Sequence, residues 1–192
     1  MLTSKKIVIF ASGSGTNAEN LVRFFEGRED VKVACIMSNN PNAYVLQRAH
    51  QLGVPSRVFN RQEFSGSDVV LNHLKELSVD LIVLAGFLWL VPPAIVAAYP
   101  KRILNIHPAL LPKYGGKGMY GDRVHEAVVA NCDAETGITI HYVDDHYDEG
   151  DVVFQARCSV MPGDDAAAVA HKIHQLEYAH FPVVVDAVLK QV

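Results

Sequence analysis

Short apolar runs, many of them rich in β-branched residues, alternate along the chain with segments whose apolar residues recur at helical spacing. The runs predict strands over Ile7–Phe10, Val31–Met37, Val54–Phe59, Asp80–Gly86 and Arg102–Ile106. The segments between them predict helices over Asn17–Gly27, Ala43–Leu52, Asp68–Leu77 and 92–99. This alternation predicts an α/β fold with a doubly wound, mostly parallel, twisted sheet and helices on both faces.

The second half of the chain departs from this rhythm. Residues 109–121 contain Pro112 and four glycines and predict a long loop, which a helix over Asp122–Cys132 follows. Thr136–Val143 alternates apolar and polar residues, which is typical of a half-buried strand. We expect Asp151–Val160 to be its antiparallel neighbour, so the sheet should end in an antiparallel C-terminal strand.

A long C-terminal helix is the last predicted element. Asp164 is the expected N-cap, and the helix is expected to run to Val192. Pro182 falls inside this segment and should kink or split the helix, because proline has no N–H to donate. No linker composition interrupts the chain, so we expect a single domain over residues 1–192.

The composition narrows the class of protein. Of the 192 residues 49% are hydrophobic, enough for a core without disulfides or a structural metal. Lys+Arg total 17 against 21 Asp+Glu, a net charge of −4 that argues against nucleic-acid binding. We expect a soluble, cytoplasmic protein for three reasons. The three cysteines are scattered, the apolar run at the N-terminus is short, and no run approaches the roughly 20 apolar residues of a membrane span. Its partners are then expected to be small molecules, with the chain a monomer or homodimer.

A glycine-rich turn follows the first predicted strand. The stretch Ser12-Gly-Ser-Gly-Thr-Asn17 leads into a helix, and the free N–H groups of a helix N-terminus bind anions such as phosphate. Gly13-x-Gly15-x-x-Ala18 also loosely fits a dinucleotide fingerprint, but the acidic residue expected after the second strand is missing. A mononucleotide-like phosphate, a nicotinamide dinucleotide and a turn without a ligand all remain open here.

Two polar residues end the fifth predicted strand. Asn105 and His107 are two residues apart and therefore lie on the same side of the strand, and Pro108 holds His107 extended. An amide and an imidazole can both donate hydrogen bonds to a developing oxyanion. The alternative to a catalytic role is a structural one, in which the two polar side chains only form hydrogen bonds to nearby backbone atoms.

An acidic segment, Asp144–Gly150, follows the sixth strand. It is a solvated turn or the source of a carboxylate that orients His107 and raises its pKa. His141, His146 and these acids could instead bind a metal, although their spacing fits no strong motif. Glu177, on the C-terminal helix, carries little weight alone.

Four segments together resemble one family. They are Ala85-Gly-Phe87, Leu104-Asn-Ile-His-Pro-Ala-Leu-Leu-Pro-Lys113, Gly137-Ile-Thr-Ile-His141 and Tyr147-Asp-Glu-Gly150. The order and content of these strings resemble the folate-dependent formyltransferases over nearly the whole chain. The resemblance implies transfer of a formyl group from 10-formyltetrahydrofolate to the amine of glycinamide ribonucleotide, the third step of purine synthesis, without a metal.

The resemblance also implies residue roles. Asn105, His107 and Asp148 would be catalytic: the first two would stabilise the tetrahedral oxyanion, His107 in its protonated form, and Asp148 would hold His107. The remaining implied contacts are Gly15, Thr16, Asn17 and Glu177 for the ribonucleotide, and Leu88, Trp89, Leu90, Val91, Asn105 and Val143 for the folate.

Some positions depart from the family pattern. Trp89 stands where arginine is common, and the folate-contacting arginine after the third strand is replaced by Ser67, with Arg61 close by. The loop 115–121 has extra residues and no histidine, for which His125 is a possible replacement. A formyltransferase acting on a sugar nucleotide or aminoacyl-tRNA, and a nucleotide-binding oxidoreductase, stay as alternatives.

Overall fold

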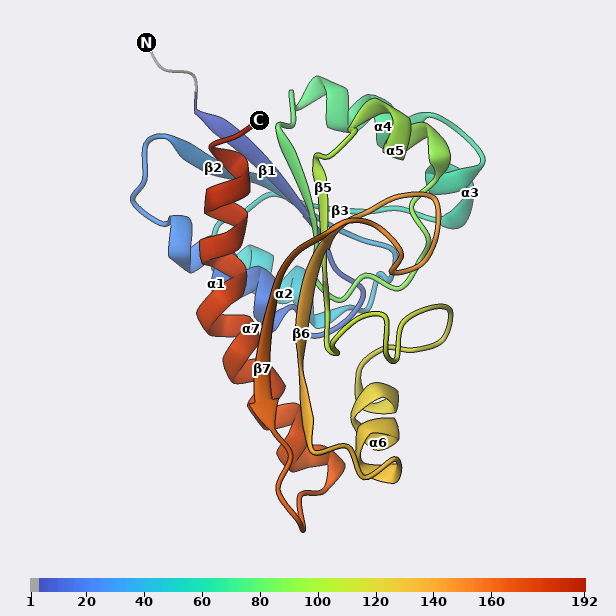
Figure 1. Cartoon of the computed structure of the whole chain (residues 1–192). Coiled ribbons are helices and arrows are strands. Elements are labelled where there is room, and N and C mark those ends of the chain that lie inside the picture. The colour runs from blue at the N-terminus through green and yellow to red at the C-terminus, as the bar shows by residue number, and fades with distance from the viewer. Residues whose placement is uncertain (1–3) are drawn as a thin grey trace.

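One seven-stranded sheet organises the molecule (Figure 1). The computed structural model describes residues 4–192. The strands are β1 (Lys5–Phe10), β2 (Val31–Ser38), β3 (Ser56–Val58), β4 (Leu81–Leu84), β5 (Ile103–His107), β6 (Glu135–Tyr142) and β7 (Val152–Ser159). They lie in the order β3-β2-β1-β4-β5-β6-β7. The chain therefore reverses its winding direction beside β1 and β4, which is where open α/β sheets bind their ligands.

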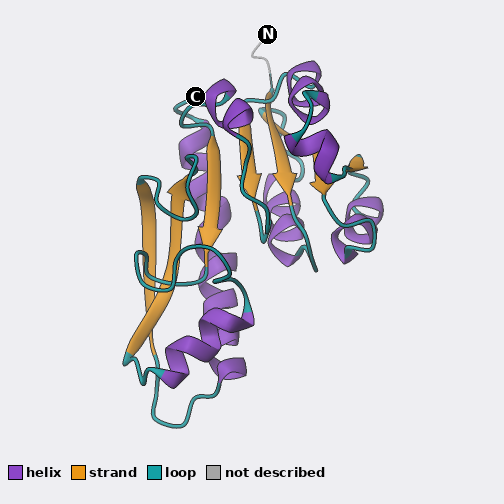
Figure 2. Ribbon diagram, turned by 90° about the vertical axis from the view of Figure 1, so that its right-hand side faces the viewer, coloured by secondary structure: helices purple, strands orange, loops and turns teal. Residues whose placement is uncertain are grey.

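The first five strands are parallel, and the last two pairings are antiparallel. The predicted fold class is thus confirmed. Two strands are clearly shorter than predicted: three of the six residues over Val54–Phe59 form β3, and four of the seven over Asp80–Gly86 form β4. Figure 2 shows that β6 and β7 extend beyond the ends of the parallel strands.

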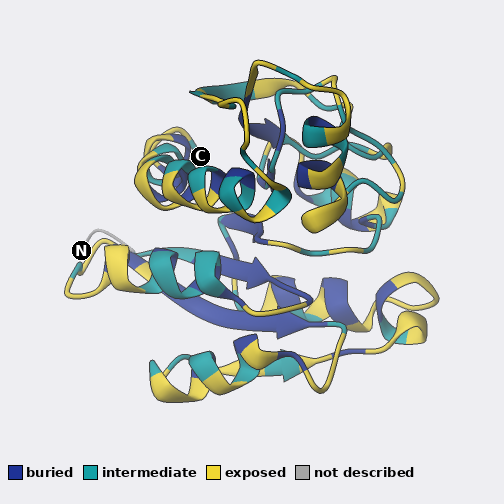
Figure 3. Ribbon diagram, turned by 90° about the horizontal axis from the view of Figure 1, so that it is seen from below, coloured by how far each residue is buried: buried dark blue, intermediate teal, exposed yellow. Residues whose placement is uncertain are grey.

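Helices cover both faces of the sheet (Figure 3). They are α1 (Thr16–Phe25), α2 (Tyr44–Gln51), α3 (Arg61–Ser65), α4 (Val69–Glu76), α5 (Pro93–Ala98), α6 (Asp122–Ala130) and α7 (Ala166–Leu189). Within residues 4–192, none of them combines the length and the apolar composition needed to cross a membrane.

Alternation along β1 divides the core into two layers. Ile7 and Ile9 pack with residues of α1, α2, α6 and α7, whereas Val8 and Phe10 pack with residues of α3, α4 and α5. All four side chains are at most 2% exposed, and each contributes roughly 1.5–3 kcal/mol by its burial. The two layers fix β1 and β4 rigidly beneath the loops at their carboxyl ends.

Helix α3 was missed from the sequence. Its signal is a capping box: the Asn60 side chain accepts the N–H of Glu63, and the Glu63 carboxylate accepts the N–H of Asn60. With five residues the helix is too short to display an amphipathic period. It nevertheless buries Phe64 in the core.

The C-terminal helix differs from the prediction in two ways. Its N-cap is Asp165 rather than Asp164, since Asp165 Oδ1 accepts the N–H of Ala168 at 2.8 Å. The helix is also not split at Pro182. Proline leaves the carbonyl four residues earlier without its helical donor, and that carbonyl, of Tyr178, accepts Asn20 Nδ2 at 3.0 Å instead.

Strand β6 is more buried than its alternating pattern predicted. Thr136 through His141 are all buried, because the loop after β5 covers the face that was expected to be exposed. Thr139 Oγ1 donates to the carbonyl of Ala109 at 2.7 Å and accepts the N–H of Leu111 at 3.0 Å. These bonds tie the loop, and with it the end of β5, to β6.

Candidate active site

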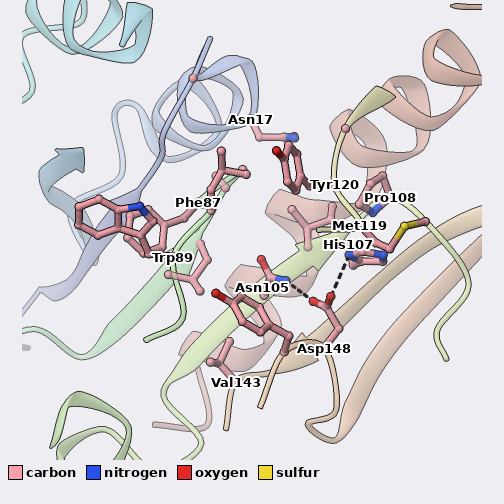
Figure 4. Close-up of a pocket in the computed structure, with 18 of the residues that line it drawn as sticks. Asn17, Phe87, Trp89, Asn105, His107, Pro108, Met119, Tyr120, Val143 and Asp148 are labelled. Carbon is pink, nitrogen blue, oxygen red and sulfur yellow. Dashed lines mark hydrogen bonds and ion pairs between the residues drawn. The ribbon is translucent and has the colours of Figure 1, made fainter. Parts of the chain in front are cut away.

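A cavity of about 540 Å³ opens at the carboxyl ends of β1, β4 and β5 (Figure 4). All the residues to which the resemblance gave a catalytic or substrate-binding role line it: Gly15, Thr16, Asn17, Leu88, Trp89, Leu90, Val91, Asn105, His107, Val143, Asp148 and Glu177. A cavity of this size accommodates a pair of small-molecule substrates or one large one.

Asn105, His107 and Asp148 converge on one wall of the cavity (Figure 4). Asn105 Nδ2 donates to Asp148 Oδ1 at 3.3 Å, and His107 Nδ1 lies 3.5 Å from Asp148 Oδ2. The amide and the imidazole share a face of β5 because they are two residues apart, as the sequence predicted. The carboxylate reaches them from the loop between β6 and β7.

His107 is only 3% exposed, and its ring is fixed at both nitrogens. Nε2 donates to the carbonyl of Tyr114 at 2.7 Å, while Nδ1 faces Asp148. Burial lowers the pKa of His107 below its usual 6.5, and the Asp148 charge and the Tyr114 carbonyl only partly oppose this. Asp148 raises this pKa, as the sequence predicted, but burial outweighs it and favours the uncharged imidazole at neutral pH.

Asp148 occupies a constrained position in its loop. Its backbone has φ 59°, and its Oδ2 accepts the N–H of Gly116 at 3.0 Å. Burial alone would raise the pKa of Asp148, but His141, His107 and the Gly116 N–H outweigh it and hold the pKa below 3.8. Gly150 closes the loop, since a Cβ there would lie 1.9 Å from the Tyr142 carbonyl oxygen. The Asp-x-Gly spacing thus has a steric reason.

The glycine-rich turn forms the opposite end of the cavity. Gly15 is the N-cap of α1 with φ 76°, and a Cβ there would lie 2.3 Å from Val45 Cγ2. No side chain caps the helix, so its first N–H groups are free for an anion. This geometry fits a phosphate.

Asn17 and Glu177 connect this turn to α7. Asn17 Nδ2 donates to Glu177 Oε2 at 2.9 Å, and burial raises the pKa of Glu177 above its usual value. Among residues 4–192, Asn17 Oδ1 and His125 Nδ1 are the buried side-chain atoms without a hydrogen-bond partner, and both residues line the cavity. Unpaired buried polar atoms in a cavity mark contacts that a ligand completes.

His125 lines the cavity, and it is the residue that the sequence offered as a replacement for the missing loop histidine. It is 2% exposed, and burial together with His174 lowers its pKa. Three further residues line the cavity without having been selected from the sequence: His174, Met119 and Tyr120. Tyr120 belongs to the long loop before α6 and lines the cavity together with Asn17 (Figure 4).

An aromatic cluster supports the apolar end of the cavity. Phe59, Phe64, Phe87 and Trp89 contact one another with ring centroids 5.0–6.4 Å apart. The guanidinium of Arg61 stacks 4.1 Å from the centre of the Trp89 ring.

Two further positions border the apolar end. The Ser67 hydroxyl donates to carbonyls of Gln62 and Glu63, so it is engaged by the preceding helix α3 rather than by the cavity. The Tyr147 hydroxyl accepts the N–H of Leu90 at 3.1 Å, a contact that the sequence did not suggest.

The part of the chain that the structure describes contains no candidate metal site. No group of three or more His, Cys, Asp or Glu side chains there is arranged to hold an ion. The His141 and His146 alternative from the sequence therefore gains no support.

Fold and site together define an α/β protein whose cavity holds an amide, an imidazole and a carboxylate on one wall and an uncapped helix N-terminus at its opposite end. A profile of the Formyl transferase family matches residues 5–185, and the chain belongs to this family. It is 38% identical over 186 residues to a phosphoribosylglycinamide formyltransferase of Haemophilus influenzae, covering 94% of this chain and 85% of that protein. The chloroplastic enzyme of that name from Arabidopsis thaliana is 35% identical, with 97% of this chain and 66% of that protein covered.

A solved structure shows the same architecture. The phosphoribosylglycinamide formyltransferase of Streptococcus pneumoniae superimposes with a TM-score of 0.85 at 36% identity, covering 96% of this chain and 98% of that one. The fold prediction and the family resemblance are both confirmed by this match.

Proposed function

We propose that the chain transfers a formyl group from 10-formyltetrahydrofolate to the amine of glycinamide ribonucleotide. The observation that carries the proposal is the convergence of Asn105, His107 and Asp148 in a cavity that also holds a free helix N-terminus. The names of the relatives support the choice of acceptor.

The reaction needs a hydrogen-bond donor to the oxyanion and a group that moves one proton from the attacking amine to the folate nitrogen. The amine nitrogen attacks the formyl carbon, the carbonyl electron pair moves to oxygen, and a tetrahedral intermediate forms. It collapses when the folate nitrogen leaves with a proton and the formyl–amine bond remains. The protein needs no nucleophile of its own, which agrees with a site built from an amide, an imidazole and a carboxylate.

The uncharged His107 suits the proton-accepting part of this reaction. Its Nε2 hydrogen is engaged by Tyr114, so Nδ1 is the nitrogen free to accept a proton. A proton that arrives there is stabilised by Asp148, whose pKa is held low and which therefore stays ionised. Asn105 supplies the hydrogen bond to the oxyanion, and such a donor typically contributes about 3–4 kcal/mol.

The two substrates take the two ends of the cavity. The phosphate of the ribonucleotide is assigned to Gly15, Thr16 and Asn17, with Glu177 next to them. The flat pterin of 10-formyltetrahydrofolate is assigned to the strip Leu88–Val91 and to Val143, which supply an apolar wall of the cavity. The reaction requires no metal in this scheme.

We place the protein in the cytoplasm, as a single domain that is a monomer or a homodimer. Its binding partners in this proposal are small molecules only. Its cysteines, Cys35, Cys132 and Cys158, are free in the described part of the chain, which suits a reducing compartment.

An acceptor comparison tests the proposal. Purified protein is mixed with 10-formyltetrahydrofolate and, in turn, glycinamide ribonucleotide, an amino-sugar nucleotide or methionyl-tRNA, and formylated product is measured by mass spectrometry. We expect product with glycinamide ribonucleotide, undiminished by EDTA. The control variant is His50→Ala on the exposed surface of α2. Absence of product with that acceptor, or a faster reaction with another, would refute the assignment.

A further inference from the structure

Asn105 has a side chain whose usefulness depends on its orientation. The amide is nearly symmetric in shape, so rotation by half a turn exchanges its donor and acceptor at almost no steric cost. The reaction proposed above needs the N–H side of Asn105 next to His107 and Asp148. Something other than shape must select that orientation.

His141 is placed to do so. It pairs directly with Asn105 across β5 and β6, is 2% exposed, and is assigned no role in the reaction. Its Nε2 lies 3.1 Å from Asn105 Nδ2. Because β5 and β6 pair with each other and each also pairs with a further strand, neither residue can move far without disturbing the sheet.

The other nitrogen of the ring decides which partner donates. His141 Nδ1 lies 2.8 Å from the carbonyl oxygen of Tyr142, which can only accept, so Nδ1 carries the hydrogen. In the neutral ring Nε2 is then an acceptor and receives a hydrogen from Asn105 Nδ2. A bond from Nε2 to Asp148 Oδ1 would span 3.5 Å, longer than an ordinary N–H···O bond.

We propose that His141 is a positioning residue that holds the Asn105 amide with its nitrogen facing the reacting centre. The inference rests on the proposed function. In the reversed orientation, Asn105 Oδ1 would face the Nε2 lone pair and the Asp148 carboxylate, so both contacts would become repulsive. Asn105 Nδ2 lies 3.1 Å from His141 Nε2 and 3.3 Å from Asp148 Oδ1, and these two acceptors are 3.5 Å apart, so one N–H can serve both while the other serves the oxyanion.

A double-mutant cycle tests this role. His141→Leu removes the acceptor at similar volume, and His141→Gln restores one at the position of Nε2. We expect kcat to fall about tenfold or more in His141→Leu, with KM for both substrates nearly unchanged, and to recover largely in His141→Gln. In an Asn105→Ala background, His141→Leu should have almost no further effect. Losses that multiply in that background would overturn the proposal, as would loss of activity in His141→Gln equal to that in His141→Leu.

A second measurement needs no substrate and is independent of the proposed function. NMR spectra of protein with ¹⁵N-labelled histidine report the ring tautomer, and the side-chain amide signals of Asn105 report its hydrogen bonds. We expect the Nδ1–H tautomer for His141 and a shift of the Asn105 signals in His141→Leu but not in the exposed control His50→Leu. An Nε2–H tautomer or unmoved Asn105 signals would overturn the positioning role even if wild-type formyl transfer is observed. Wild-type inactivity with the expected spectra would overturn the proposed function instead.

Discussion

At the scale of single residues, the site is controlled by what burial does to charge. His107 is surrounded by protein on nearly every side, so its ring rests uncharged although a carboxylate lies 3.5 Å away. The carboxylate opposes the effect of burial without outweighing it, and in the proposed reaction it stabilises the proton that His107 accepts. A static ion pair would have kept the imidazole protonated and unable to accept the proton of the attacking amine.

The pH dependence of the reaction follows from this charge state. Neutral His107 is the active form and its pKa lies below 6.5, so the acidic limb of kcat/KM should lie below pH 6.5. Asp148→Asn removes the charge that raises this pKa and should move the limb to still lower pH. Initial rates between pH 5 and 9, corrected for titration of the substrate amine, measure both. A limb above pH 7 in the wild type would contradict the account.

Gly150 is a residue whose replacement should affect the site through geometry alone. In Gly150→Ala the new Cβ would meet the Tyr142 carbonyl, so the loop must shift and carry Asp148 away from His107. We expect a fall in kcat of about tenfold or more, with binding of the ribonucleotide retained. Glu149→Ala, an exposed neighbour, is the matched control and should behave as wild type. Equal rates for both variants would show that the loop tolerates the displacement.

At the scale of elements, contacts between helices and strands decide features that local patterns suggest only in part. Helix α7 continues through Pro182 because Asn20 of α1 donates to the carbonyl that proline leaves unpaired. Strand β6 is buried because Thr139 holds the loop after β5 against it. Both features join elements far apart in the sequence.

The Asn20 contact gives a prediction about stability. Asn20→Ala should lower the free energy of unfolding by about 1 kcal/mol, because the Tyr178 carbonyl loses its donor. In a Pro182→Ala background a helical N–H becomes available to that carbonyl, so the same substitution should cost less. Urea unfolding of the four proteins in this cycle measures the difference. Equal costs in the two backgrounds would show that Asn20 does not compensate for Pro182.

At the scale of the whole molecule, much of the fold and the approximate site could be read from the sequence. The alternation of apolar runs and helical stripes predicted the parallel strands, and the positions of Asn105, His107 and the glycine-rich turn at strand ends predicted one shared edge. The resemblance to a family added Asp148 and Glu177, which local pattern alone did not single out.

The rest depends on contacts that no local pattern contains. The pKa of His107 depends on how completely the loop near Tyr114 covers it, and the partner of Asn105 depends on the register between β5 and β6. His125 and Tyr120 line the cavity together with Asn17, which is far from them in the sequence. Such features follow from tertiary packing, which a one-dimensional pattern specifies only indirectly.

The rate of a single turnover in Asp148→Asn tests the central claim most directly, since asparagine preserves the shape and can still accept the Gly116 N–H but cannot stabilise a protonated His107. With both substrates bound, the account predicts formyl transfer slower than wild type by about a hundredfold or more, with an unchanged melting temperature and unchanged Kd for each substrate. A rate within about threefold of wild type would contradict it, because the carboxylate would then have no part in moving the proton.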